Sequence, residues 1–251
     1  MITIEECLHH FDEELAAASH AFRIFEEVLP SPTPTKTPQG WLLRYADPMI
    51  EQAMLMKLAR LISITSAIRH LVAAGQFHEQ GILQRVADET NDDIVFLAFG
   101  KQNGLIAIHR QYLKRFWREE FDGGATPSTY QPRSMVRRSE IHAYLSKQSP
   151  AGQVRSAKGV DRMIYGVYSG FVHGASTHIF DLIDPETHRY RLSGAEGNED
   201  TDDYRMDSLN YPVRTLMCAV VVARTLGEGE LADGLVKRVD AFLKWLAQLR
   251  D

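Results

Sequence analysis

The sequence predicts an all-α fold, a bundle of about seven or eight helices with one inserted β-hairpin near residues 177–192. Three observations support this prediction. Apolar side chains recur every three or four residues along most of the chain, which is the spacing of helices that bury one face. Several of these segments begin or end at residues that start or stop helices. Alternation of apolar and polar residues, the pattern of a strand, is clear at one place only.

The first predicted helix covers residues 2–29, with its apolar side chains on one face. It ends before a segment with four prolines, which lack the amide hydrogen that a helix needs. We therefore interpret residues 30–47 as a proline-rich connector. Asp47 and Pro48 then form a helix start, an N-cap followed by proline at the first helical position, and this second helix runs to Gly75.

The rest of the chain is predicted as further helices around one insertion. The stretches "THIFDLI" and "HRYRLS" alternate apolar and polar residues on either side of "DPET", which predicts the hairpin at 177–192. The acidic, glycine-containing segment after it is predicted as a loop, so hairpin and loop form an insertion over residues 177–205. We expect residues 1–251 to form a single helical domain. The remaining helices are predicted over residues 79–101, 105–121, 135–148, 154–174, 211–226 and 231–250.

The composition is that of a globular protein, with 44% hydrophobic and 24% charged residues. A net charge of −5 argues against a surface built as a whole for nucleic acid or for an anionic membrane. The first residues lack the basic and apolar segments of a secretory signal, and the most apolar run, residues 216–223, is too short to cross a bilayer. Cys7 and Cys218 imply no disulfide framework. We therefore expect a cytoplasmic protein without a membrane partner.

A polar stripe on the helix predicted over 154–174 is the main candidate site. Residues three, four and seven positions apart share one face of a helix. The stripe consists of Arg155, Arg162, Tyr165, Ser169 and His173. The neighbouring stripe consists of Gly166, Gly170 and Gly174, and small residues at this spacing let another segment come close. We expect the polar stripe to border the bundle interior, with a hydrogen bond between Ser169 and His173.

Two chemical interpretations of this stripe are weighed against a structural one. Ser169 would be a nucleophile with His173 as its base, but a serine within a helix has no free backbone N–H groups beside it to form an oxyanion hole. A structural hydrogen bond is the alternative. His173 and His178 would share a metal only if the helix ended between them, because five residues place them about 140° apart. We expect no metal site and no cofactor.

A run of acidic residues falls in the third predicted helix. Asp88, Glu89, Asp92 and Asp93 place like charges at four-residue spacing, which destabilises an isolated helix by a few tenths of a kcal/mol per pair. We interpret the run as a solvated face. The alternative is that a divalent cation or a basic partner neutralises it.

A basic segment balances this run. Residues 133–162 contain seven basic and two acidic residues, a net charge of +5 that leaves −10 for the rest of the chain. Arginine matches phosphate and carboxylate oxygens bidentately, so the segment favours an anionic ligand, and nucleic acid would bind only here. The alternative is pairing with acidic neighbours such as residues 196–203. The expected ligand-binding residues are Arg137, Arg138, Arg155, Arg162 and Tyr165.

One short pattern points to RNA cleavage. Arg137 and His142 match the arginine-x4–6-histidine pattern of HEPN ribonucleases, helical nucleotide-binding proteins found in toxin and defence systems. The polar residue that usually follows the arginine in that family is Arg138 here, which puts the match in doubt.

The late helix carries a second resemblance. With Tyr165, Ser169 and His173 it resembles a group of all-helical bacterial proteins that have a tyrosine, a serine and a histidine at this spacing and look distantly like HEPN bundles. The likeness covers about residues 50–175, and the predicted hairpin and acidic loop fall outside it. The resemblance implies a helical bundle and no particular activity.

These observations together predict a binding module for a small anionic ligand, phosphate-bearing compounds included. The enzymatic alternative is a metal-independent ribonuclease in which His142 or His173 acts as general acid or base and arginine stabilises the developing charge. The third alternative is a structural partner protein without a ligand site. A homodimer formed through exposed apolar helix faces is a further expectation.

Overall fold

The computed structural model describes most of the chain. The described residues are 2–37, 40–118, 135–148, 166, 168–184, 186–194 and 202–249.

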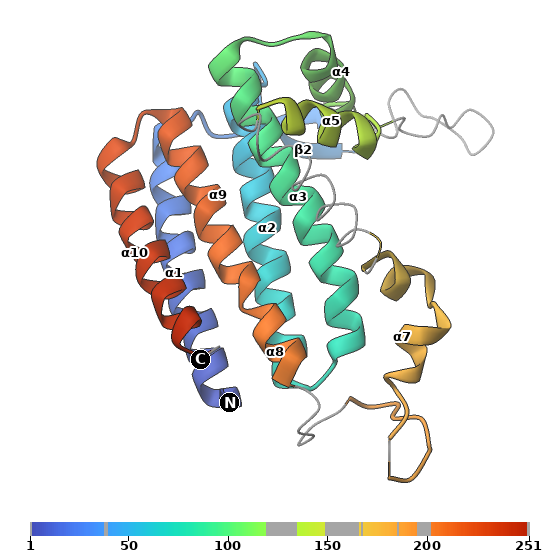
Figure 1. The fold of residues 1–251 in the computed structure, drawn as a ribbon. Coiled ribbons are helices and arrows are strands. Elements are labelled where there is room, and N and C mark those ends of the chain that lie inside the picture. Colours follow the sequence, from blue (N-terminus) through green and yellow to red (C-terminus); the bar gives the residue numbers. More distant parts are fainter. Residues whose placement is uncertain are drawn as a thin grey trace, which may run out of the picture.

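Within the described part of the chain, five long helices form a bundle, which confirms the predicted all-α fold (Figure 1). The helix α2 lies at the centre and packs against α1, α3 and α9, while α10 packs on the outer side of α9. Helix α3 also contacts α9, so the two helices flank one face of α2. The five helices are α1 (Ile4–Val28), α2 (Ile50–Ala73), α3 (Phe77–Asn103), α9 (Asn210–Leu226) and α10 (Gly229–Gln248).

The ends of these helices follow from local sequence. Helix α1 begins at a capping box, in which the Thr3 hydroxyl accepts from the amide of Glu6 and the Glu6 carboxylate accepts from the amide of Thr3. Helix α2 begins at Ile50, so the prediction of Asp47 as its N-cap was wrong by two residues. Gly227 ends α9 in the left-handed conformation, with φ of 85°, which glycine adopts without strain.

Short helices lie at both ends of the bundle. Helices α4 (Ala107–Phe116) and α5 (Arg138–Gln148) cover one end. Of the helix predicted over 154–174, residue 166 and residues 168–173 are described, and they are helical. Helix α7 (Ser176–Phe180) follows them.

The structure confirms one inserted β-hairpin but places it elsewhere. Strands β1 (Thr33–Thr37) and β2 (Gly40–Arg44) pair antiparallel within the segment that we interpreted as a connector. The prolines that argued against structure are tolerated because a two-stranded hairpin has a free outer edge on each strand, where a missing amide hydrogen breaks no ladder bond.

The predicted hairpin near 177–192 was therefore wrong in position. That segment contains α7 and a single isolated bridge between Ile183 and Tyr190. The alternating pattern fails here because the apolar side chains that would form a buried face, including Phe180 and Leu192, are exposed. The predicted acidic loop up to residue 205 also needs correction, because α8 (Asp202–Ser208) begins inside it.

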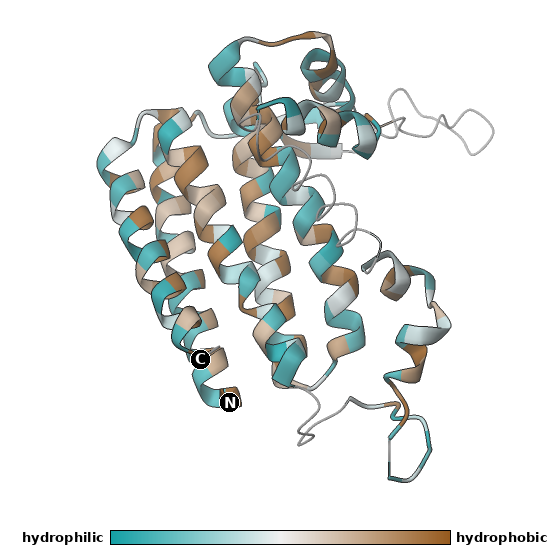
Figure 2. Cartoon of the chain, viewed as in Figure 1, coloured by the Kyte–Doolittle hydropathy of each residue, from teal (hydrophilic) through white to brown (hydrophobic). Residues whose placement is uncertain are grey.

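The core lies between the five long helices, where apolar residues are dense on α2 and α9 (Figure 2). Large side chains such as Phe25, Met54 and Phe96 are fully buried. Each contributes about 1.5–3 kcal/mol to folding by leaving water. Cys7 and Cys218 are buried and unbridged. Among the described helices, none combines the length and the apolar character that crossing a membrane requires.

Candidate functional site

The acidic face of α3 is paired inside the protein, so its interpretation as a solvated face was wrong. Asp93 is 1% exposed, and its carboxylate accepts from Lys57 Nζ at 2.7 Å and from Arg138 Nη1 at 2.6 Å. Burial by itself raises the pKa of Asp93, but the bonds from the two cations hold it below its ordinary value. The basic partner that the alternative required is supplied by α2 and α5 of the same chain.

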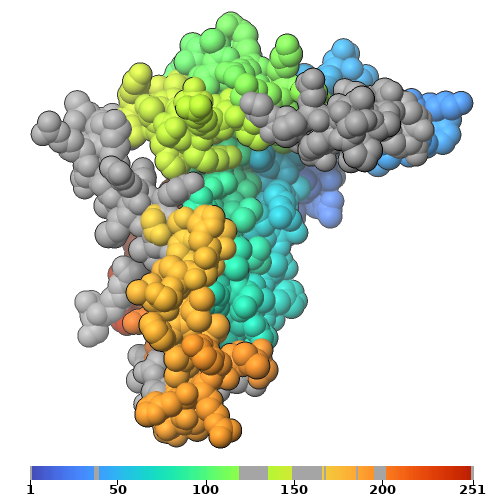
Figure 3. All heavy atoms as spheres, turned by 90° about the vertical axis from the view of Figure 1, so that its right-hand side faces the viewer, coloured from blue at the N-terminus to red at the C-terminus, as the bar shows by residue number. Residues whose placement is uncertain are grey.

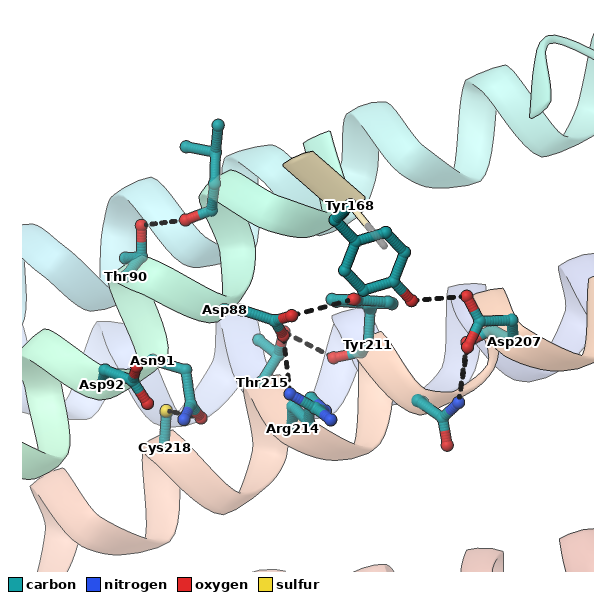
Figure 4. Close-up of polar contacts among 12 residues, drawn as sticks. Asp88, Thr90, Asn91, Asp92, Tyr168, Asp207, Tyr211, Arg214, Thr215 and Cys218 are labelled. Carbon is teal, nitrogen blue, oxygen red and sulfur yellow. Dashed lines mark hydrogen bonds and ion pairs between the residues drawn. The ribbon is translucent and has the colours of Figure 1, made fainter. Parts of the chain in front are cut away.

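The other acidic residues of α3 also have partners. Asp92 Oδ2 lies 3.0 Å from His142 Nε2 of α5. Asp88 accepts from Arg214 Nη1 of α9 at 2.6 Å and from the hydroxyl of Tyr211 at 3.4 Å (Figure 4). These contacts fasten α5 and α9 to α3.

Arg137 and Arg138, which we expected to bind a ligand, lie where α5 begins. Arg138 is engaged within the protein, because its Nη1 also donates to the carbonyl oxygen of Glu89 at 3.0 Å. It is therefore held by α3 rather than presented to a ligand. Arg137 is exposed at the start of α5.

The predicted polar stripe is only partly described. Arg155, Arg162 and Tyr165 lie outside the described residues. Ser169 is half-buried and His173 is exposed, and no hydrogen bond joins these two described side chains. His173 lines neither the cleft beside α3 nor the two hollows between α1 and α2.

A cleft of about 490 Å³ lies on the adjacent face of the same segment. Residues 168–181 run along the side of the bundle formed by α3 (Figures 1 and 3), and the cleft lies between this segment, α3, α8 and α9. Its aromatic lining comes from Tyr168, Phe171, His178, Tyr204 and Tyr211. Its polar lining comes from Gln84, Asp181, Asp203, Asp207, Asn210 and Arg214.

Two glycines allow this segment to approach closely. An added Cβ on Gly81 of α3 would lie 2.7 Å from the ring of Phe171, closer than real side chains come. Within the segment, the ring of His178 packs in the same way against Gly170. The close approach of another segment that we expected along the glycine stripe is not seen at Gly166 or Gly174, where an added Cβ would meet nothing closer than 3.5 Å. The rings of Phe171 and His178 have centroids 4.1 Å apart. Phe171 is thereby held against α3 and forms one wall of the cleft.

Carboxylates hold the tyrosine hydroxyls of the cleft. The hydroxyl of Tyr168 donates to Asp207 Oδ2 at 2.6 Å, as Figure 4 shows. The hydroxyl of Tyr204 donates to Asp181 Oδ2 at 2.9 Å. Burial, followed by neighbouring carboxylates, raises the pKa of Tyr168 and Tyr211 above the ordinary value. The tyrosines therefore stay protonated and serve as hydrogen-bond donors rather than as bases.

Gln84 of α3 is the most unusual residue in the lining. Its side chain is 2% exposed, and its Nε2 has no hydrogen-bond partner among the residues that the structure describes. Buried polar groups are nearly always paired, because leaving one unpaired costs about 1–3 kcal/mol. An unpaired amide in a cleft wall is therefore a candidate contact for a ligand.

Sequence reasoning missed most of this cleft. The missed residues come from three helices: Gln84 from α3, Tyr204 and Asp207 from α8, and Tyr211 and Arg214 from α9. The available signal was the polar group Tyr211 and Arg214 at the start of an otherwise apolar helix. Among the described residues, no group of three or more histidine, cysteine, aspartate or glutamate side chains is arranged to hold a metal ion.

The raised pKa of Asp88 predicts that the stability of the protein depends on pH. Burial, with a further contribution from Asp92 and Asp207 and against the opposing effect of Arg214, raises the pKa of Asp88 from 3.8 to about 6. Folding therefore favours the protonated form, and the stability that Asp88 contributes is complete below about pH 4 and is lost as the pH rises through 6. The uncharged variant Asp88→Asn lacks this loss.

Urea unfolding at pH 4.5 and 7.5 measures the effect. Relative to wild type, Asp88→Asn is expected to gain about 2 kcal/mol between the two pH values. Each pKa unit corresponds to about 1.4 kcal/mol, and pH 4.5 already lies above the ordinary pKa of 3.8, so this range measures part of the full effect. Asp233→Asn, on the exposed side of α10, serves as control and is expected to follow wild type. A constant difference between Asp88→Asn and wild type at both pH values would contradict the assignment.

Comparisons with protein-family models, with curated proteins and with solved structures find no match to this chain. The role of the cleft is therefore inferred from its own residues.

Proposed function

We propose that this protein is a binding module for a small molecule and that the cleft between α3, α8, α9 and residues 168–181 is its binding site. The observation that carries the proposal is the unpaired amide of Gln84 in the wall of an aromatic-lined cleft. The cleft volume of about 490 Å³ falls within the usual range of small-molecule sites.

The lining supports binding more directly than chemistry. Aromatic side chains provide apolar contact area, and the hydroxyls of Tyr168 and Tyr204 are already fixed by hydrogen bonds to carboxylates. A ligand that accepts a hydrogen bond from Gln84 Nε2 would remove the energetic penalty of an unpaired buried amide. No nucleophile with an adjacent base supports a reaction among the described lining residues.

The anionic ligand expected from sequence has weaker support. It depended on Arg155 and Arg162, which lie outside the described residues, and on Arg138, which is paired with Asp93. A ribonuclease with His142 as its base is likewise a weaker candidate. His142 does contact Asp92, a partner that would orient its ring, but Arg138, one turn earlier on α5, is paired with Asp93 rather than placed to stabilise a developing charge.

A purely structural role and a homodimer remain alternative proposals. Trp41 and Leu43 on β2 are exposed apolar residues and would suit a protein contact. Neither requires the cleft. The two free cysteines support a cytoplasmic location, which we also propose.

The test uses 3-methylbenzamide, a neutral flat ring with a carbonyl oxygen that can accept from Gln84. A fragment of this size is expected to bind with a Kd of about 1 mM, measured by protein-observed NMR titration, with shift changes concentrated on α3, α8 and the start of α9. Gln84→Leu keeps the side-chain volume and removes the unpaired amide. This variant is expected to stabilise the free protein by about 1 kcal/mol and to weaken fragment binding about five- to tenfold.

Gln80→Leu, one turn earlier on α3, is the matched control. Gln80 Oε1 also lacks a partner among the described residues, but its Nε2 donates to the carbonyl oxygen of Tyr204 at 3.1 Å. Gln80→Leu would leave that carbonyl unpaired and is therefore expected to destabilise the protein. If Gln84→Leu raises the free energy of unfolding and Gln80→Leu lowers it, the Gln84 amide is free to bind a ligand and the Gln80 amide is structural. Absence of any fragment binding, or a destabilising Gln84→Leu, would overturn the proposal.

A further inference from the structure

The charge of the cleft points to the class of its ligand. We propose that the cleft takes an organic cation with a flat ring and a hydrogen-bond acceptor, such as an N-alkylated heterocycle that bears a carboxamide. This inference rests on the proposed function, since it presumes that the cleft is a binding site.

The described lining carries three carboxylates and one guanidinium. The carboxylates are Asp181, Asp203 and Asp207, and the guanidinium is that of Arg214. The positive charge of Arg214 is balanced by a further carboxylate, because its Nη1 donates to Asp88 at 2.6 Å. The charge that a ligand meets among these residues is therefore negative, and a cation would be attracted.

Each carboxylate retains capacity for a further bond. An ionised carboxylate offers about four acceptor positions. Asp181 accepts from Tyr204, and Asp207 accepts from Tyr168 and Asn210. Asp203 is exposed and has no hydrogen-bond partner among the described residues. Together the three carboxylates leave several oxygens for the N–H groups or the diffuse charge of a cation.

Aromatic rings beside the carboxylates suit the same ligand. A cation over the face of an aromatic ring is attracted by about 0.5–2 kcal/mol, the larger values applying where water is excluded. The ring of Tyr204 stacks on Phe77 of α3, with centroids 5.4 Å apart, and is thereby held in place. Phe171 is held in turn against Gly81. Two fixed rings next to carboxylates favour a flat cation over a flexible aliphatic one.

Gln84 provides an observation independent of the acidic residues. Its side chain is 98% buried, its Nε2 is unpaired among the described residues, and it lies in the cleft lining. Because an amide N–H is a donor, the ligand must present an acceptor to it. A carbonyl oxygen on the ligand's ring meets this requirement while the cationic part faces the aspartates.

Three probes of nearly identical shape test the charge directly. They are the cation 1-methylnicotinamide, the neutral 3-methylbenzamide and the anion 3-methylbenzoate, each of which offers a carbonyl oxygen. NMR titration at low salt is expected to give a Kd for the cation about tenfold below that of the neutral probe, with the anion binding weakest. Raising the salt concentration is expected to reduce the preference for the cation.

Two substitutions localise the effect. Asp203→Asn removes an exposed charge without breaking a bond among the described residues, and it is expected to reduce the preference for the cation over the neutral probe about threefold. Asp233→Asn on α10 is the matched control and should change neither affinity. Equal affinity for the cation and the neutral probe would overturn this inference and leave the proposed function standing. Tightest binding of the anion would also overturn it, and no binding of any probe would overturn both.

Discussion

Replacing Asp93 by alanine is expected to lower the free energy of unfolding by about 3–5 kcal/mol. Asp93 is 1% exposed and balances two cations, Lys57 and Arg138, whose side chains are themselves largely buried. Removing the carboxylate leaves both charges facing one another without compensation, which is far less favourable than the loss of a single hydrogen bond. Because Arg138 attaches α5 to α3, we also expect the end of the bundle formed by α5 to loosen.

Asp92 provides the matched control one residue away on the same helix. Its pair with His142 is about 30% exposed on both sides, so Asp92→Ala is expected to cost less than about 1 kcal/mol. Urea unfolding at neutral pH measures both variants. The penalty of Asp93→Ala should shrink in acid, because the stability that an ion-paired carboxylate contributes is lost as the pH falls through its lowered pKa. Equal effects of the two substitutions would show that burial of Asp93 does not decide the outcome.

Replacing Gly81 by alanine is expected to weaken binding of 1-methylnicotinamide at least about tenfold, if the cleft binds as proposed. The added Cβ would lie 2.7 Å from the ring of Phe171, so the ring must move away from α3. Contact with a phenylalanine ring is worth about 1.5–3 kcal/mol when fully buried, and 1.4 kcal/mol corresponds to a tenfold change in Kd. The crowding is expected to lower the free energy of unfolding by about 1–3 kcal/mol. The higher helix propensity of alanine offsets about 1 kcal/mol of this loss.

Gly234 on α10 is the matched control, because an added Cβ there meets nothing within 4 Å. Gly234→Ala is expected to stabilise the protein by about 0.5–1 kcal/mol and to leave binding unchanged. Thermal unfolding and the NMR titration together measure both variants. If Gly81→Ala stabilised the protein as much as Gly234→Ala and bound the probe with unchanged Kd, the contact of Phe171 with Gly81 and its role as a wall of the cleft would be contradicted.

Much of the fold could be predicted because helices are local. The apolar spacing of α1, α2, α3, α9 and α10 places each within a few residues of its predicted range. The hairpin was misplaced because its segment contains prolines, which oppose a central strand but not an isolated pair of edge strands. The alternation near residue 183 predicted strands wrongly, since alternation stabilises a sheet only when one face is buried.

The candidate site was less predictable. The sequence singled out the segment around residue 170, which borders the cleft, but the face that does so carries Tyr168 and Phe171 rather than Ser169 and His173. A helical pattern shows which residues share a face, and both faces of this short segment contain polar and aromatic groups. Which one meets α3 is decided by the space beside Gly81, and a single sequence does not reveal that contact.

The sequence by itself determined where the long helices lie and which of their side chains form the core, because backbone hydrogen bonds and helical spacing act within a few residues. Tertiary structure alone decided that the acidic run on α3 is internal, since its cations lie 36 and 45 residues away for Asp93 and 126 residues away for Asp88. Burial and pairing of a charge depend on which helices pack together. For the same reason the cleft exists only where α3, α8, α9 and residues 168–181 meet.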